Sequence, residues 1–158
     1  ANGSQRETDF KLLDGITVKL DQDARLIVSA PHLELHEFQT SDLAEITGPR
    51  TFKWLGRADH IINSGGIKIN PIEIEREVEP ILGHKCVVLG LPHPTWGQEL
   101  VLVVETLNKQ MSEETVMQSI QSHLSSTQRP KKIVFMNEFP RNESMKTDRI
   151  SIYNSVRN

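Results

Sequence analysis

The pattern of apolar residues changes once along this chain, and the change limits the folds that the chain can adopt. Residues 10–30 hold short apolar runs separated by turn signals, and residues 31–56 continue as short strands without a helical signature before residue 70. After residue 70, apolar residues recur at helical spacing between strand-like runs. We therefore expect an all-β segment up to residue 56 and then an α+β domain of about 100 residues.

The α+β part is expected to hold a three-stranded sheet, a β-hairpin and two to three helices. Asn70 and Pro71 suit the cap and first position of a helix through IEIEREVEPIL, with Glu73 and Glu75 in its first turn. A second helix is expected over residues 112–125, and a short third one in RISIYNSVRN. Three runs have the composition of strands: KCVVLGL, ELVLVVETL and KKIVFM.

The composition argues against several classes of protein. A net charge of −3 gives no sign of a nucleic-acid or membrane-surface binder. No apolar stretch approaches the ~20 residues of a membrane helix, and the polar first residues do not resemble a signal peptide. The single cysteine, Cys86, lies in an apolar run, so we expect a buried thiol and a reducing, cytoplasmic setting. The chain does not begin with methionine, so we expect it to be part of a longer protein.

Two histidines and a glutamate invite comparison with a metal site. His32, Glu34 and His36 occupy alternate positions, so one face of a strand could carry all three. A zinc site also needs a further convergent ligand and supporting hydrogen bonds, and the sequence offers neither. We expect a solvated strand face and no metal.

The stretch WLGRADHIINSGG carries more polar chemistry than a hairpin needs. Arg57 and Asp59 could pair at the surface for little gain, or Arg57 could reach a ribose or phosphate while Asp59 lies at a pivot. Ser64, Gly65 and Gly66 could form a flexible turn, or could let the backbone approach a ligand closely. No dinucleotide-binding or phosphate-loop motif is present, so the residues alone leave both interpretations open.

Asp42 and Lys146 also admit two interpretations each. The segment Thr40–Asp42 is most simply an ordinary turn between two strands, although an ionised aspartate could accept two hydrogen bonds from a ribose diol. Lys146 stands in the polar loop RNESMKTDR, where it could simply be solvated. It could also bring a compact positive charge to a reacting carboxylate or phosphate.

Five segments in order resemble a known family: TSD, FKWLGRAD, INSGGIKINPIEIE, VVLGLPHPTWGQELVLVV and RPKKIVFMNEFPRNESMKTDR. Together they resemble the C-terminal third of the AMP-forming acyl-CoA synthetases, over residues 38–150. Within that family, the INSGG wording and the short loops are most similar to the 2-succinylbenzoate–CoA ligases of menaquinone biosynthesis.

The resemblance implies a domain order and a set of substrates. Residues 1–56 would be the β-rich end of the large N-terminal adenylation domain, 57–60 the hinge, and 61–158 the mobile C-terminal domain. The whole enzyme would use a carboxylic acid, CoA and ATP with Mg²⁺, the last two bound mainly by the N-terminal domain. That domain of the same protein would be the partner, with no nucleic acid and no membrane involved.

The resemblance also implies residue roles in the first half-reaction. Asp42 matches the aspartate that binds the ribose hydroxyls of ATP, and Arg57 matches the arginine that contacts the ribose and phosphate region. Lys146 matches the catalytic lysine, three residues before Arg149 as in the family pattern.

For the second half-reaction, the resemblance assigns a hinge and a loop. Asp59 matches the residue about which the C-terminal domain rotates. Gly65, Gly66 and Lys68 fall on the loop that faces the active site during thioester formation.

Three departures from the family pattern stand out. Ser41 replaces the usual glycine before Asp42, and Met145 replaces the usual glycine before Lys146, where its bulk is expected to restrict the loop. The family's phosphate loop and its Tyr-Gly-x-Thr-Glu segment are missing, because they belong to the N-terminal domain. We therefore expect this chain alone to be inactive.

Two other functions remain open. The chain could be a non-catalytic module that docks on an acyl-carrier protein or a larger synthetase. Arg129, Lys131 and Lys132 form a small basic cluster that lacks the interleaved aromatics of a nucleic-acid site, and it could instead meet a phosphate of CoA.

Overall fold

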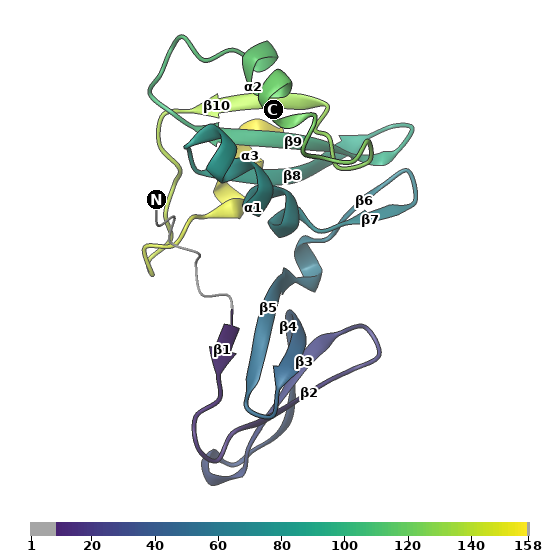
Figure 1. The fold of residues 1–158 in the computed structure, drawn as a ribbon, viewed down its shortest axis with the longest axis vertical. Coiled ribbons are helices and arrows are strands. Elements are labelled where there is room, and N and C mark those ends of the chain that lie inside the picture. The colour runs from purple at the N-terminus through teal and green to yellow at the C-terminus, as the bar shows by residue number, and fades with distance from the viewer. Residues whose placement is uncertain (1–8, 158) are drawn as a thin grey trace. The chain divides into compact units, whose positions relative to one another are not determined.

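The computed structural model describes residues 9–157, and the chain divides between His60 and Ile61 into two compact units (Figure 1). The first unit is all-β apart from two single helical turns, and the second unit combines strands and helices. The predicted α+β class, with a β segment preceding a mixed domain, is confirmed.

A single antiparallel sheet makes up the first unit, in the order β1-β5-β4-β3-β2. Its strands are β1 (Asp9–Lys11), β2 (Thr17–Leu20), β3 (Arg25–Ala30), β4 (Leu35–Gly48) and β5 (Thr51–Arg57). Two 3₁₀ turns, Pro31–Leu33 and Ala58–His60, were not expected before residue 70. A single turn carries no helical periodicity, which explains why the sequence pattern did not indicate them.

The segment Thr40–Asp42 lies inside β4 and not between two strands, which corrects the predicted turn. β4 pairs Gln39 with Ile27 and Leu43 with Arg25, so three residues of β4 stand opposite one residue of β3. The extra residues form a bulge, in which the Thr40 hydroxyl donates to the Leu26 carbonyl (2.8 Å) and accepts from the Asp42 amide (3.1 Å). Hydrogen bonds of the kind expected in a turn are therefore made within a continuous strand.

Three long strands and a hairpin form the sheet of the second unit. They are β6 (Ile62–Ser64), β7 (Ile67–Ile69), β8 (Cys86–His93), β9 (Gly97–Glu105) and β10 (Lys132–Met136). β9 is central, antiparallel to β8 and parallel to β10. The predicted three-stranded sheet and hairpin are both present, and the hairpin extends the same sheet because Ser64 of β6 pairs with Gly97 of β9.

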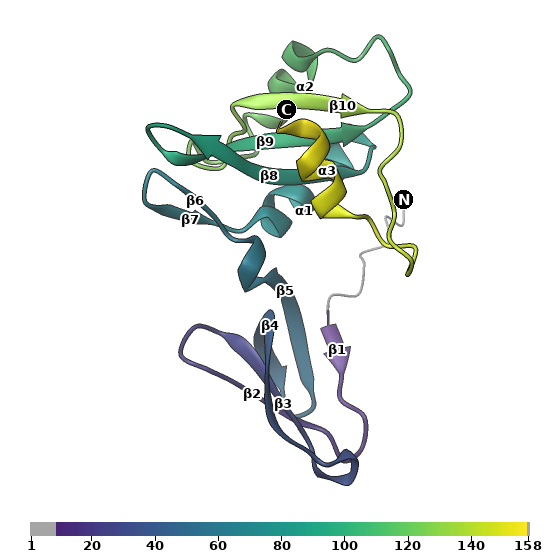
Figure 2. The ribbon, with the colours of Figure 1, turned by 180° about the vertical axis from the view of Figure 1, so that it is seen from behind.

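Helices cover both faces of this second sheet (Figures 1 and 2). They are α1 (Pro71–Leu82), α2 (Glu113–Ile120) and α3 (Arg149–Val156). Leu100, Leu102 and Val104 of β9 pack on the face of α1 and α2, and Val101 and Val103 pack on the face of α3. The period of two along β9 thus supplies two separate apolar layers.

The start of α1 follows the sequence signals, and a glycine ends the helix. The Asn70 side chain accepts from the Ile72 amide at 3.1 Å, and Gly83 ends the helix in the left-handed conformation. The predicted place of Glu75 in the first turn of the helix is wrong, because Glu75 lies beyond that turn and is only 8% exposed. Its burial between α1 and the sheet was not visible in a pattern that counts only apolar positions.

α2 ends at Ile120, five residues before the predicted end at Ser125. After Ile120 the chain continues in turns, and Leu124 is still buried. The apolar spacing in the sequence therefore extends beyond the end of the helix. Leu124 is buried by the turns that follow, at a position where a longer helix would also have buried it.

The prediction of a buried thiol is confirmed, since Cys86 is 3% exposed in the core under α1. Burial, together with the nearby charges of Glu79 and Glu75, raises the pKa of the Cys86 thiol to about 12. Among residues 9–157, no helix has both the length and the apolar character needed to cross a bilayer.

Candidate functional site

Asp42, Arg57 and Asp59 gather at the end of the first unit. Asp42 stands opposite Arg57 across the β4–β5 pair, and their side chains approach to 3.9 Å (Nη1–Oδ1). The Arg57 guanidinium group also donates hydrogen bonds to both carboxylate oxygens of Asp59, from Nε at 2.9 Å and from Nη2 at 3.0 Å. One arginine therefore connects the bulged strand to the turn that ends the unit.

The charges in this cluster reinforce one another. The hydrogen bond from Arg57 lowers the pKa of Asp59, and the bond to Asp59 raises the pKa of Arg57. Asp42 accepts a hydrogen bond from the indole nitrogen of Trp54 at 3.1 Å. A third of the Asp42 side chain is exposed (34%), so a ligand with hydroxyl groups can reach this fixed carboxylate.

Gly65 and Gly66 form the two-residue turn of the β6–β7 hairpin. Their φ angles are +59° and +83°, which residues other than glycine adopt only with strain. Nothing lies within 4 Å of a Cβ built on Gly66, so the backbone conformation, and not crowding, requires glycine there. Lys68 lies on β7 opposite Asn63 and is exposed, so the turn and the lysine share one hairpin.

An aromatic cluster beside the glycine turn was missed in the sequence. The Trp96 carbonyl accepts from the Gly65 amide at 2.9 Å, and the Trp96 ring stacks on His93 with centroids 4.2 Å apart. His93 Nδ1 accepts from the amides of Thr95 and Trp96, which fixes the short β8–β9 turn. The signal was present in PHPTWGQ, where a histidine precedes a tryptophan within one turn, but periodicity does not detect it.

Part of the predicted basic cluster has a structural task. Arg129 Nε donates to the carbonyls of Gln121 and Leu124, so its guanidinium group closes the turns after α2. Lys131 lies over the Trp96 ring with Nζ 5.7 Å from the centroid. The basic cluster and the glycine turn are therefore connected through Trp96.

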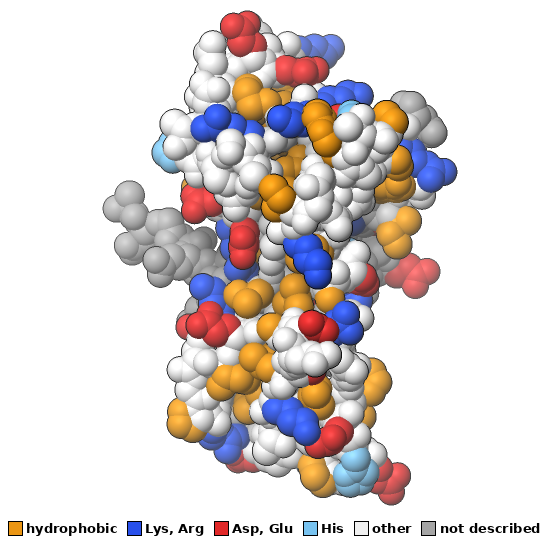
Figure 3. All heavy atoms as spheres, turned by 90° about the vertical axis from the view of Figure 1, so that its right-hand side faces the viewer, with side chains coloured by type: hydrophobic (Ala, Val, Ile, Leu, Met, Phe, Trp, Pro, Cys, Tyr) orange, Lys and Arg blue, Asp and Glu red, His pale blue; other side chains and the backbone are white. Residues whose placement is uncertain are grey.

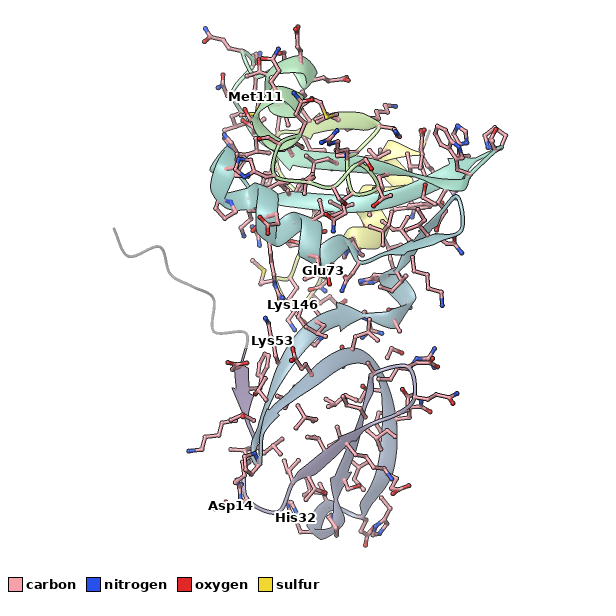
Figure 4. The ribbon with its side chains drawn as sticks, turned by 45° about the vertical axis from the view of Figure 1, so that its right-hand side comes forward. Asp14, His32, Lys53, Glu73, Met111 and Lys146 are labelled. Carbon is pink, nitrogen blue, oxygen red and sulfur yellow. The ribbon has the colours of Figure 1, made fainter. Side chains whose placement is uncertain are left out.

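Lys146 is exposed on a tight loop between β10 and α3, and Figure 4 shows it at the end of the second unit opposite Met111. The loop is closed by an Arg141–Thr147 bridge and by the Asn142 amide, which donates to the Lys146 carbonyl at 2.8 Å. The Asn142 side-chain oxygen accepts from the amides of Ser144 (2.9 Å) and Lys146 (3.1 Å). This asparagine therefore defines the path of the loop.

Met145 adopts a positive φ of +63° and is 71% exposed. Such a conformation is costly for a methionine and free for a glycine. The loop reaches the conformation that a glycine would favour even with a long side chain at this position.

The base of the lysine loop is tied into the core. Asp148 caps α3 by accepting from the amide and hydroxyl of Ser151, which lowers the pKa of Asp148. Arg149, the next residue, pairs with Glu75 of α1 at 2.7 Å and donates to the Val88 carbonyl at 3.0 Å.

The predicted strand face with His32, Glu34 and His36 is wrong. His32 lies in the 3₁₀ turn Pro31–Leu33, and Glu34 ends that turn in the left-handed conformation. Only His36 belongs to a strand, β4, so the three side chains do not share a face. Figure 4 shows His32 at the same end of the first unit as Asp14. Within residues 9–157, no group of three or more His, Cys, Asp or Glu side chains is arranged to hold a metal.

The predicted site residues thus fall into three groups. Asp42, Arg57 and Asp59 are together in the first unit, while the glycine turn with Lys68 and the lysine loop belong to the second unit. Figures 1 and 2 show the β6–β7 hairpin and the lysine loop at opposite sides of the second unit.

Comparison with known proteins gives consistent matches. Residues 83–146 match a family model described as the AMP-binding enzyme C-terminal domain. Over 110 residues the chain is 30% identical to a long-chain-fatty-acid–CoA ligase of Mycobacterium tuberculosis, covering 69% of this chain and 22% of the relative. It is 34% identical over 114 residues to a 2-succinylbenzoate–CoA ligase of a Geobacillus species, covering 69% and 23%.

Solved structures match the fold over most of the chain. The crystal structure of ATP-bound MatB from Rhodopseudomonas palustris superposes with a TM-score of 0.81 at 21% identity, covering 92% of this chain and 35% of that one. The fold therefore matches the C-terminal part of adenylate-forming enzymes. The chain spans about a fifth of the length of the relatives that it matches in sequence (22% and 23%).

Proposed function

We propose that this chain is the C-terminal part of an ATP-dependent, AMP-forming acid–CoA ligase. The observation that carries the proposal is the lysine loop, because Lys146 is exposed on a loop fixed by Asn142 and by the buried base at Arg149. The match to the AMP-binding enzyme C-terminal domain runs up to the same lysine. The relatives named above are CoA ligases, which supports the reaction class.

In the first half-reaction, a carboxylate oxygen of the acid attacks the α-phosphorus of ATP, and the bond to pyrophosphate breaks. Two anions must approach each other, so a positive charge placed between them lowers the barrier more than it improves ground-state binding. Lys146 would supply that charge. Asp42 would accept hydrogen bonds from the ribose hydroxyls, with Arg57 beside it on the ribose and phosphate side.

In the second half-reaction, the CoA sulfur attacks the acyl carbon, the bond to AMP breaks, and the thiol proton is released. The C-terminal domain would rotate about Asp59, which removes Lys146 and brings the hairpin of Gly65, Gly66 and Lys68 to the reaction. Support comes from the second unit, whose lysine loop and hairpin lie at opposite sides, so one rotation can exchange them (Figures 1 and 2).

The CoA nucleotide would meet the Trp96 cluster. Trp96 is 41% exposed and bonded to Gly65, so an aromatic surface lies directly beside the hairpin turn. Lys131 over that ring, with Lys132 next to it in the sequence, offers positive charge to a phosphate.

Mg²⁺ would accompany ATP, and its ligands would come mainly from the N-terminal domain. The described residues do not fit a magnesium site, since no cluster of three acidic or histidine side chains occurs among them. A cytoplasmic location suits the single free thiol of this chain.

The acid is proposed to be 2-succinylbenzoate, which would place the enzyme in menaquinone biosynthesis. Two 2-succinylbenzoate–CoA ligases reach 34% identity, against 30% for the long-chain-fatty-acid–CoA ligase. A pyrophosphate-release assay of the full-length protein with a panel of acids tests this choice separately from the reaction class.

The experiment that tests the reaction class is Lys146→Ala in the full-length protein. We expect the rate of adenylate formation, measured as pyrophosphate release, to fall by about 100-fold to 1000-fold, because one preorganised contact is lost. Thioester formation from supplied acyl-adenylate should stay close to the unmodified rate. Lys109→Ala is the matched control, since Lys109 is exposed and stands two positions before Met111, which Figure 4 shows at the other end of the unit. Equal loss of both steps, or unchanged pyrophosphate release as a docking module would give, would overturn the proposal.

A further inference from the structure

Glu75 is the most deeply buried charged side chain among residues 9–157, and it is connected to the lysine loop. It lies on α1, 8% exposed, and its Oε1 atom accepts from the Val88 amide of β8 at 2.8 Å. The same oxygen pairs with Arg149 Nη2 at 2.7 Å. Arg149 is the first residue of α3 and follows Lys146 by three positions.

These contacts form a closed ring across three elements. The Val88 amide donates to Glu75, Arg149 donates to Glu75, and the same Arg149 nitrogen donates to the Val88 carbonyl at 3.0 Å. Val88 therefore uses both of its backbone groups on the edge of β8 that faces away from β9. The guanidinium group is directed by two acceptors on different elements, which fixes its position more tightly than a single ion pair would.

The loop that carries Lys146 is joined to this ring through Asp148, the residue before Arg149. Its base is closed by the Asp148 amide, which donates to the Pro140 carbonyl at 2.8 Å. Its tip is closed by Asn142, whose side chain accepts from the Lys146 amide. Because the loop is braced internally, the place where it joins the core decides where Lys146 points.

Stability alone is a weak reason for a buried ion pair. Burial raises the pKa of the Glu75 carboxyl, even though Arg149 beside it acts in the opposite direction. A well-packed apolar pair of similar size often stabilises a protein as much as a buried ion pair does. What an apolar pair cannot supply is a fixed direction for the chain that enters α3.

We propose that Glu75 is a positioning residue for Lys146, acting through Arg149 at the base of the lysine loop. This inference rests on the proposed function, in which Lys146 stabilises the adenylation transition state. A displacement of about 1 Å at a reacting group can cost about 100-fold in rate, so a small shift of the loop base is sufficient.

The test compares Glu75→Gln with Glu79→Gln in the full-length protein. Glutamine keeps the size of Glu75 and an acceptor oxygen but removes the charge that holds Arg149. We expect kcat for adenylation to fall by about 10-fold to 100-fold, with KM for ATP and the rate of thioester formation from acyl-adenylate unchanged. Glu79 is the matched control on the same helix, since it accepts from the Cys86 amide at 3.1 Å and belongs to α1 as Glu75 does. Glu79→Gln should leave both half-reactions unchanged.

A second measurement uses the 158-residue chain and needs no activity. In Glu75→Gln, amide hydrogen exchange at Asp148 should become about tenfold faster, because the base of the loop loses a charge-assisted contact. Exchange in α2, at Val116, should not change in the same sample.

The outcomes separate the two proposals. Selective loss of adenylation in Lys146→Ala but an equal fall of both half-reactions in Glu75→Gln would overturn only the role of Glu75, because a merely structural residue lowers both steps together. Unchanged kinetics and unchanged exchange in Glu75→Gln would overturn it as well. Retained adenylation in Lys146→Ala would overturn the proposed function itself, whatever the exchange at Asp148 shows.

Discussion

Two arginine–carboxylate pairs lie in different regions of this molecule, one in each unit. Arg57 and Asp59 pair at 2.9 Å with 41% and 54% of their side chains exposed. Arg149 and Glu75 pair at 2.7 Å with 18% and 11% exposed. The distances are similar, so the two pairs differ mainly in access to water.

That difference decides what each pair can do. Water and salt compensate an exposed pair that opens, so Arg57 can release Asp59 at little cost and rebond. A buried pair that opens leaves a charge without water, so Arg149 stays on Glu75. The exposed pair suits a segment that is proposed to rotate, and the buried pair suits one that must hold a lysine still.

The surroundings of the pairs differ in the same way. Among the buried hydrophobic residues within residues 9–157, only Leu26, Ala30 and Ala44 belong to the first unit. Phe10, Phe38 and Ile46 of that unit remain 42% to 56% exposed, and Figure 3 shows hydrophobic side chains at its surface among charged ones. The second unit, which holds the buried pair, has a cluster of buried apolar side chains on each face of its sheet.

The largest expected effect comes from Glu75→Ala, which breaks the buried pair. Removing one partner leaves the Arg149 guanidinium group buried without its carboxylate, and we expect the free energy of unfolding of the second unit to fall by about 3–5 kcal/mol. Urea unfolding in a Trp54→Phe background reports on this unit through the fluorescence of Trp96, the second of the two tryptophans.

Two controls accompany this measurement. Glu79→Ala, on the same helix, should cost clearly less, because the Glu79 side chain is only partly buried and water can reach the groups that it leaves, such as the Cys86 amide. The double variant Glu75→Leu with Arg149→Leu should recover much of the lost stability, since no charge is left buried. A Glu75→Ala loss below 1 kcal/mol would mean that water reaches the pair, and the contrast with Arg57–Asp59 would disappear.

Much of the second unit could be predicted because its signals are local. Asn70 and Pro71 specify the start of α1, and Gly65 with Gly66 specifies the hairpin turn. Each of these residues acts within a few positions of its own place in the sequence. Capping and turn formation therefore appear directly in the order of residues.

Features that depend on distant partners could not be predicted. The bulge at Thr40–Asp42 exists because β4 pairs with β3 on one side and β5 on the other. Glu75 meets Arg149 across 74 positions of sequence, so it looked like a charge at the start of a helix. Trp96 reaches Gly65 only because the hairpin joins β9.

A smaller effect is expected at the cap of α3, next to the buried pair. Asp148→Asn keeps an acceptor for the Ser151 amide but does not titrate. Because hydrogen bonds from Ser151 lower the pKa of Asp148 in the folded chain, its contribution to stability is fully present above the pKa of the unfolded chain and is lost as pH falls through the folded pKa. The unmodified chain should therefore lose stability relative to Asp148→Asn on acidification.

Unfolding of both chains between pH 7 and pH 2, followed by Trp96 fluorescence, checks this sign. The gap between them should be constant near neutral pH and should close or reverse in acid. A gap that stays constant over the whole range would show that the carboxylate of Asp148 contributes no more than an amide does.

The smallest effect is expected for Asp59→Asn, which weakens the exposed pair. We expect the first unit to lose only about 0.2–1 kcal/mol, and less at 1 M salt, because more than half of the Asp59 side chain is in water and salt screens the charges. Trp54 fluorescence in a Trp96→Phe background measures it, since Trp54 bonds to Asp42 in the same cluster. Arg57 lowers the pKa of Asp59, so even this contribution should vanish as pH falls through the folded-state value. A loss of several kcal/mol that salt does not reduce would make Arg57–Asp59 a fixed anchor like Arg149–Glu75, and a rotation about Asp59 would then have to break a strong contact in every cycle.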